Sequence, residues 1–124
     1  MKVLCVAGMP GCGKEEFLRV ADEHGFSIVR MGDVVREEAA KQGIGTSDEA
    51  IGGFAHAERE RHGFGIWAER TLPRVTVERV VIDGLRGSME LEAFRKALGE
   101  SVQVVAIHAA PKVRFEWAVS SRPP

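Results

Sequence analysis

The sequence predicts an α/β domain in which a parallel sheet is covered by helices on both faces. Short runs of apolar residues alternate along the chain with stretches of helical periodicity. Runs that are apolar throughout are typical of strands buried on both faces. Glycines follow most of the helical stretches, where they can end a helix. Strands that are repeatedly separated by helices favour a parallel sheet in a layered α/β/α fold.

The first half of the chain begins with two strand-helix units. An apolar run at 2–7 predicts the first strand, and the apolar spacing after it predicts a helix over 14–23. A second run at 26–31 predicts the next strand, followed by a helix over 34–41 that Gly43 can end.

The segment between the second and third strands is predicted to be helical. Thr46, with Glu49 three residues later, forms the pattern of a capping box, which predicts a helix that runs toward His62. The pair Gly52-Gly53 weakens the expectation that this helix is continuous, because glycine is a poor helix former. A short helix over 66–72 follows.

The second half of the chain repeats the pattern. An apolar run at 79–83 predicts the third strand, and Ser88 is expected to cap a helix that extends through Leu98. Residues 102–107 form the fourth strand, and Pro111 suits the first turn of a last helix. Right-handed crossovers make 2-3-1-4 the expected strand order.

Length and composition describe one ordinary domain, spanning residues 1–124. A chain of 124 residues can bury about two-thirds of its unfolded surface in one core. The net charge of −1 argues against a nucleic-acid partner bound through bulk charge. No apolar run is long enough for a membrane span or a signal peptide, so we expect a cytoplasmic protein with no membrane partner. Two cysteines are too few for a disulfide scaffold or a four-ligand zinc site.

A glycine-rich turn stands between the first strand and the first helix. Its residues match G-x-x-x-x-G-K of the P-loop in the required strand-turn-helix context: Gly8, Met9, Pro10, Gly11, Cys12, Gly13 and Lys14. Glycines let successive backbone N–H groups turn inward around phosphate oxygens, and the following helix adds its positive end. Lys14 supplies a mobile cation that can follow a β- or γ-phosphate during transfer. The turn therefore predicts ATP binding with Mg²⁺.

The eighth position of the motif departs from the pattern. It is normally Ser or Thr, whose hydroxyl binds Mg²⁺, and here it is Glu15. A carboxylate about 4 Å from a phosphate charge would cost on the order of 4 kcal/mol at an effective dielectric constant near 20, unless a metal ion lies between them. Glu15 either holds the metal or turns away, or it acts only as an acidic residue in a first helical turn.

Two further segments place charged side chains at the ends of strands. Asp33 and Arg36 follow the second strand one helical turn apart, and a guanidinium there suits a monophosphate; alternatively, Asp33 only caps its helix and Arg36 lies on the surface. Asp83 ends an apolar strand in the Walker-B pattern, which places an acidic group near Mg²⁺. Gly84 allows a sharp turn that could return Arg86 to the same phosphates.

These segments together resemble a known family. Gly-Asp-Val-Val-Arg at 32–36 is similar to a segment of adenylate kinases, and Asp-Gly-Leu-Arg at 83–86 looks like a shortened form of their Asp-Gly-Phe-Pro-Arg. With the loop at 8–14 and the segment at 106–115, the chain resembles archaeal adenylate-kinase-related P-loop proteins, some called nucleotide kinase-like or dephospho-CoA kinase-like. The likeness covers essentially the whole chain.

The resemblance implies a P-loop NTPase fold and a phosphotransferase. ATP would lie at the loop, Arg36 and Arg86 would hold a small nucleotide acceptor together with Asp33 and Gly84, and Asp33 and Asp83 would order magnesium-bound water. Lys14, Arg36 and Arg86 would then be the catalytic residues. Such kinases continue into an arginine-containing lid and a fifth strand, whereas this sequence ends before them, so we expect a domain truncated before the fifth strand. Arg114 and Arg122 are either remnants of the lid or residues of a solvated helix face.

The expected reaction is transfer of the γ-phosphoryl group of ATP to a phosphate-bearing acceptor, with a nucleoside monophosphate or dephospho-CoA as alternatives. A second alternative is a regulatory module that binds a nucleotide with little turnover, because of Glu15 and the missing lid. A GTPase is disfavoured by the absence of an Asn-Lys-x-Asp motif.

The charged segment at 56–62 is expected to be a solvated helix face, or to flank the acceptor site. Trp67 is expected to be a packing anchor, with a platform for base stacking as the alternative.

Overall fold

The computed structural model describes residues 1–8 and 13–107. Four residues of the predicted P-loop, Met9, Pro10, Gly11 and Cys12, lie outside the described residues. The segment 108–124, with the helix expected after Pro111 and with Arg114 and Arg122, lies outside them as well.

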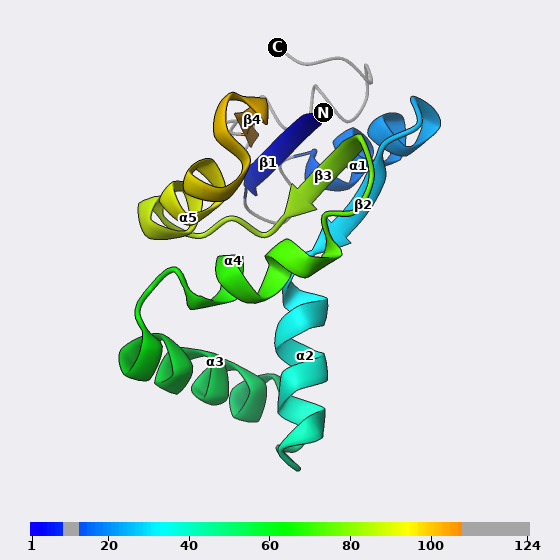
Figure 1. Cartoon of the computed structure of the whole chain (residues 1–124). Helices are drawn as coiled ribbons and strands as arrows, with labels where there is room; N and C mark the ends of the chain where they lie inside the picture. Colours follow the sequence, from blue (N-terminus) through cyan, green and yellow to red (C-terminus); the bar gives the residue numbers. More distant parts are fainter. Residues whose placement is uncertain (9–12, 108–124) are drawn as a thin grey trace.

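The sheet has four parallel strands: β1 (Lys2–Gly8), β2 (Ser27–Arg30), β3 (Arg79–Asp83) and β4 (Val102–Ile107). Their order is β2-β3-β1-β4, so the predicted order 2-3-1-4 is confirmed. Figure 1 shows β1 and β3 side by side in the middle of the sheet. In a parallel sheet, all strands end at the same edge, and this edge collects the side chains discussed below.

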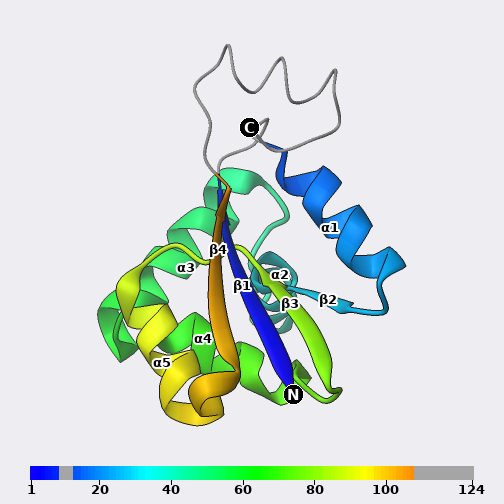
Figure 2. The same ribbon diagram turned by 90° about the horizontal axis from the view of Figure 1, so that it is seen from above.

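Five helices are described: α1 (Lys14–Glu23), α2 (Met31–Lys41), α3 (Asp48–His62), α4 (Ile66–Thr71) and α5 (Ser88–Leu98). Short 3₁₀ turns follow α4 at Leu72–Arg74 and α5 at Gly99–Ser101. Figure 2 shows α1 on one side of the sheet and α4 and α5 on the other, which confirms the predicted three-layer α/β/α fold. No helix in the described part of the chain has the length and apolarity required to cross a membrane.

The hydrophobic core is divided by the sheet. Along β3, Val80 and Ile82 pack into one cluster with residues of α2, α4 and α5, whereas Val81 packs into the other with Leu18 of α1. All three β3 residues are fully buried. This alternation follows from the period of two along a strand, and it explains why residues 80–82 are all apolar: both faces of the strand are covered.

Three helix starts differ from the sequence-based expectations. The cap expected at Thr46 is wrong: the N-cap of α3 is Ser47, whose extended backbone lets its Oγ accept a hydrogen bond from the Ala50 N–H at 3.1 Å. The expected Ser88 cap is also wrong, because Gly87 is the N-cap of α5 and Ser88 is its first residue. Helix α2 begins at Met31, three residues earlier than expected, and this places Asp33 in its first turn.

Helix α3 runs without a break through Gly52 and Gly53. Neither glycine adopts a positive φ, and an added Cβ at either position would meet no atom within 4 Å. The two glycines therefore reduce the intrinsic stability of α3 without changing its path.

Candidate functional site

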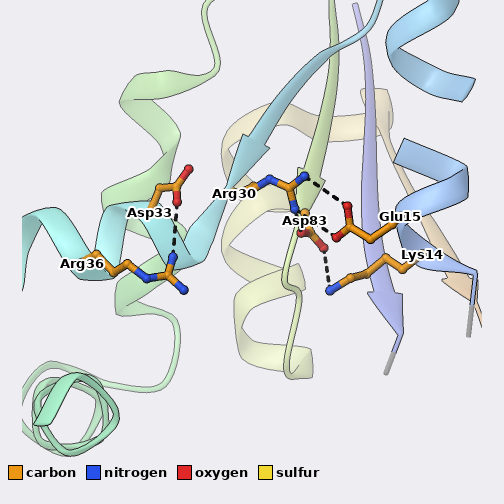
Figure 3. Close-up of polar contacts among 6 residues, drawn as sticks. All are labelled: Lys14, Glu15, Arg30, Asp33, Arg36 and Asp83. Carbon is orange, nitrogen blue, oxygen red and sulfur yellow. Dashed lines mark hydrogen bonds and ion pairs between the residues drawn. The ribbon is translucent and has the colours of Figure 1, made fainter. Parts of the chain in front are cut away.

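Three strand ends bring the charged side chains together. β1 ends at Gly8, where the P-loop begins, β2 ends at Arg30, and β3 ends at Asp83. In the register of the sheet, Arg30 lies beside Asp83, and Asp83 lies beside Val6 of β1. Figure 3 shows Arg30 and Asp83 with Lys14 and Glu15, which come from the first turn of α1.

Lys14 points across the sheet edge toward β3. It is the first residue of α1, preceded by Gly13 in a left-handed conformation (φ 95°), which side chains with a Cβ disfavour. Its Nζ lies 3.2 Å from Asp83 Oδ1. The structure thus brings together the lysine of the predicted P-loop and the carboxylate of the predicted Walker-B strand (Figure 3).

Asp83 is a buried carboxylate, with 8% of its side chain exposed. Its Oδ2 accepts a hydrogen bond from Arg30 Nη1 at 2.9 Å. Its Oδ1 is buried and accepts no hydrogen bond from the described residues, although Lys14 Nζ is within ion-pairing distance. The chain turns away immediately afterwards, because Gly84 has a positive φ of 104°.

The donor set of this edge fits Mg²⁺, which prefers oxygen ligands and commonly keeps several waters. Asp83 Oδ1 offers an unsatisfied acceptor, and the Glu15 carboxylate is held nearby through Arg30. The described protein side chains alone do not form a metal site. Residues 1–8 and 13–107 contain no group of three or more His, Cys, Asp or Glu side chains that could hold a metal. A magnesium ion bound here would need waters and substrate oxygens to complete its coordination.

Glu15, at the eighth position of the motif, turns toward Arg30. Its Oε1 and Oε2 lie 3.4 and 3.5 Å from Arg30 Nη1 and Nη2. Its side chain is 73% exposed, so it lies at the surface of the site. The pKa of Arg30 is raised, chiefly because its guanidinium faces the Glu15 carboxylate.

A cavity of about 430 Å³ opens beside Lys14 and Asp83 and extends between α2, α3 and α4. Five of the residues that line it are cationic: Lys14, Arg30, Arg36, Arg59 and Arg86. Three are acidic: Asp48, Asp83 and Glu90. Its remaining wall is largely apolar and includes Val35, Ile51 and Trp67. A cavity with converging cations and an apolar wall suits a small anionic ligand.

The predicted acceptor-binding residues meet at this cavity, with one exception. Arg36, Gly84 and Arg86 line it, whereas Asp33 is absent from the described lining. Instead, Asp33 Oδ1 accepts a hydrogen bond from Arg36 Nη1 at 3.3 Å (Figure 3). The Arg36 guanidinium lies so close to Gly32 that an added Cβ would sit 3.2 Å from its Nη1.

Sequence reasoning assigned no individual role to four other lining residues: Arg30, Asp48, Arg59 and Glu90. One of them, Arg59, lies in the charged segment 56–62, which was offered as a possible flank of the acceptor site. Glu90 is 2% exposed, and its Oε1 accepts a hydrogen bond from the Arg86 backbone N–H at 2.7 Å, so it fixes the chain that carries Arg86. Within residues 1–8 and 13–107, neither Arg59 nor Arg86 forms a salt bridge, which leaves two guanidinium groups available to an anion. The alternating charges at 56–62 were the only sequence signal for Arg59.

The expectation that the segment 56–62 is a solvated face is only partly correct. Glu58 is 7% exposed, and its Oε1 accepts a hydrogen bond from Arg70 Nη1 of α4 at 2.9 Å. The Arg70 guanidinium also lies over the ring of Trp67, 4.8 Å from its centroid. Trp67 is 1% exposed and donates from Nε1 to the Ala55 carbonyl, so its role as a packing anchor is confirmed, and it joins α4 to α3 behind the cavity.

The chain is similar in sequence to proteins from archaea. It is 45% identical to a UPF0200 protein of Thermoplasma volcanium over 115 residues, which cover 92% of this chain and 64% of the relative. It is 48% identical to a UPF0200 protein of Thermoplasma acidophilum over 114 residues, which cover 91% of this chain and 62% of the relative. The chain thus spans somewhat less than two-thirds of the length of these relatives.

Two further comparisons concern the domain itself. A gluconokinase from Sinorhizobium meliloti superposes on 99% of this chain and 67% of its own length, with a TM-score of 0.47 and 20% identity. The family described as an AAA domain, a P-loop family, matches residues 7–122. The match includes Lys14 and Asp83 and covers nearly all of the chain, and the chain belongs to this AAA domain family.

Proposed function

We propose that this protein binds ATP with Mg²⁺ at the P-loop and transfers the γ-phosphoryl group to a small phosphate-bearing acceptor, a nucleoside monophosphate. The observation that carries the proposal is the position of the cavity. It begins at Lys14 and Asp83, where the triphosphate would end, and continues to Arg36, Arg59 and Arg86. An anion held by these arginines would lie next to a γ-phosphate held by Lys14.

The residues would act mainly by position and charge. Arg36, Arg59 and Arg86 would orient an acceptor phosphate, since a guanidinium can bind two phosphate oxygens at once. An oxygen of that phosphate forms the new bond to the γ-phosphorus, the bond from the γ-phosphorus to the β–γ bridging oxygen breaks, and ADP leaves with the electron pair. The attacking oxygen is already ionised, so the reaction needs no general base.

Lys14 would change partners during binding. In the structure Lys14 pairs with Asp83, at 3.2 Å. The β- and γ-phosphates together carry more negative charge than one carboxylate, so the ammonium would move to the phosphates and stabilise the charge that develops on them. A magnesium ion bound through water to Asp83 would neutralise further charge on the β- and γ-phosphates.

The reaction can be tested by measuring ADP formation from ATP and Mg²⁺ with AMP, CMP or dephospho-CoA, and without an acceptor. We expect ADP formation that depends on a nucleoside monophosphate and that falls roughly a hundredfold or more in Lys14→Ala, the magnitude typical of a lost electrostatic stabiliser. Arg74→Gln, on the exposed surface where Arg74 pairs with Glu37, is the control and should leave the rate unchanged.

A second candidate, a nucleotide-binding regulatory module, is favoured by one observation, the glutamate in place of the hydroxyl residue that usually binds Mg²⁺. The two candidates predict different results. A regulatory module would be stabilised by ATP, by about 2.7 kcal/mol at a hundredfold excess over its dissociation constant, yet would form no ADP with any acceptor. Acceptor-dependent ADP formation would exclude it.

A further inference from the structure

The contacts of Arg30 raise a question that the P-loop motif does not answer. Glu15 places a carboxylate directly after the lysine that would bind phosphate. A negative charge at this position repels the β- and γ-phosphates unless it is neutralised. Arg30 is the residue that faces it, with Nη1 and Nη2 opposite Oε1 and Oε2 of the carboxylate.

We propose that Arg30 is a positioning residue that neutralises Glu15 and anchors Asp83, and so keeps the P-loop able to bind phosphate despite its acidic eighth position. The inference rests on the proposed binding of a nucleotide at Lys14. It concerns a residue from β2, outside the P-loop and outside the segments that predicted the site. The position of Arg30 at the carboxyl end of β2 makes the contact possible, because this strand end lies beside Asp83 in the sheet.

One guanidinium serves both carboxylates. Arg30 Nη1 donates to Asp83 Oδ2 at 2.9 Å, and the same group lies 3.4 Å from Glu15 Oε1. A planar guanidinium with several fixed donors can bridge two acceptors in this way, whereas a lysine ammonium is a single point charge. The bridge links the first turn of α1 to the end of β3.

The charges of the cluster show what Arg30 contributes. Lys14 and Arg30 are cations, and Glu15 and Asp83 are anions, so the four groups sum to zero. Without Arg30 the sum is −1, and Lys14 is left as the single cation for two carboxylates. Lys14 would then be held more firmly by Asp83 and would be less available to a phosphate. Removal of Arg30 should therefore weaken nucleotide binding, and removal of Glu15 as well should restore it.

The test is a set of four proteins: wild type, Arg30→Gln, Glu15→Gln and the double variant. Each is titrated with ADP in the presence of EDTA, by isothermal calorimetry, so that no metal takes part. We expect Arg30→Gln to weaken ADP binding about tenfold, Glu15→Gln to preserve or tighten it, and the double variant to return to within about threefold of wild type. The Arg30→Gln defect should shrink in high salt, because the Glu15 side chain is largely exposed.

Two further variants complete the design. Arg74→Gln is the matched control, since the Arg74 and Arg30 side chains are 37% and 41% exposed and each pairs with a glutamate. It should bind ADP like wild type. Arg30→Lys keeps the charge but cannot contact Glu15 and Asp83 at the same time. Its affinity for ADP should lie between those of wild type and Arg30→Gln. If Arg30→Gln does not fold, Arg30→Lys takes its place in the comparison.

Two results would overturn the inference. One is an Arg30→Gln protein that binds ADP as tightly as wild type. The other is an equal loss in Arg30→Gln and in the double variant, because Arg30 would then act on the phosphate directly or through Asp83 alone. The outcomes also separate this inference from the proposed function. If the wild-type chain binds no ADP, both are wrong. If the variants show the expected binding pattern but no ADP forms in response to an acceptor, only the proposed transfer is refuted.

Discussion

The buried ion pair behind the cavity allows a quantitative test of how α3 and α4 are held together. Glu58 of α3 and Arg70 of α4 approach to 2.9 Å, and their side chains are 9% and 25% exposed. We consider Arg70→Met, which removes the charge and keeps an apolar side chain of similar length. The substitution leaves the Glu58 carboxylate buried without its main partner, and the one ionisable partner that remains among residues 1–8 and 13–107 is His62, whose Nε2 lies 3.8 Å away.

The expected loss follows from three contributions. Removing one partner of a buried pair typically costs about 3–5 kcal/mol, because the other charge stays buried. The Arg70 side chain is one-quarter exposed, so in the variant water can solvate part of the Glu58 carboxylate. The expected loss therefore lies at the low end of that range. The contact of Arg70 with the Trp67 ring adds on the order of 0.5–1 kcal/mol. Together these give a loss of about 3–4 kcal/mol in the free energy of unfolding.

Urea denaturation of the purified chain, followed by circular dichroism, measures this loss. The double variant Glu58→Gln/Arg70→Met should regain at least half of it, because no unpaired carboxylate remains. Arg74→Met, which breaks the exposed pair with Glu37, is the control and should cost about 0–1 kcal/mol. If Arg70→Met costs no more than this control, with an unchanged dependence on urea, the pair does not hold α3 against α4 and the reasoning is wrong.

Three further predictions concern the cavity, a helix and the core. Arg59→Gln should raise the KM for the acceptor about tenfold and leave the dissociation constant for ATP unchanged, because Arg59 reaches the cavity from α3 and not from the loop before α1; an unchanged KM would remove Arg59 from the acceptor site. Gly53→Ala should stabilise the chain by up to about 1 kcal/mol in urea denaturation, since a Cβ there meets no atom within 4 Å; a destabilised variant would contradict this. Burial raises the pKa of the Cys5 thiol to about 11, so the unfolded thiol ionises first and the free energy of unfolding should fall as the pH rises from about 9 to about 11. In Cys5→Ala this part of the pH dependence should be lost, and an equal slope in both proteins would assign it to other groups.

Much of the fold could be predicted because its signals are local. Each of the four strands contains a run of apolar residues, and their order follows from the handedness of the crossovers. Helix starts were less certain, because Thr46 and Ser47 are adjacent and both can cap. Only the backbone conformation at Ser47 decides between them.

The site was predictable only in part, for a physical reason. Lys14 and Asp83 stand in motifs whose spacing along the chain carries the signal. Arg30 gains its contacts from the register of β2 against β3, which no local pattern encodes. Arg59 and Glu58 occupy the same charged segment, and tertiary packing alone turns one toward the cavity and buries the other against Arg70.

The two glycines within α3 have a consequence for how a ligand enters. Of the 15 residues in this helix, only Ala55 and Glu58 are buried, and Gly52 and Gly53 lower its intrinsic helicity. Amide protons of α3 should therefore exchange with deuterium sooner than those of β1 and β3, through local opening that leaves the sheet intact. Because α3 carries Arg59 and Ile51, each opening exposes the cavity, and a bound acceptor should slow this exchange. The domain thus combines a sheet edge that carries Lys14 with a helical wall, α3, of which little is buried.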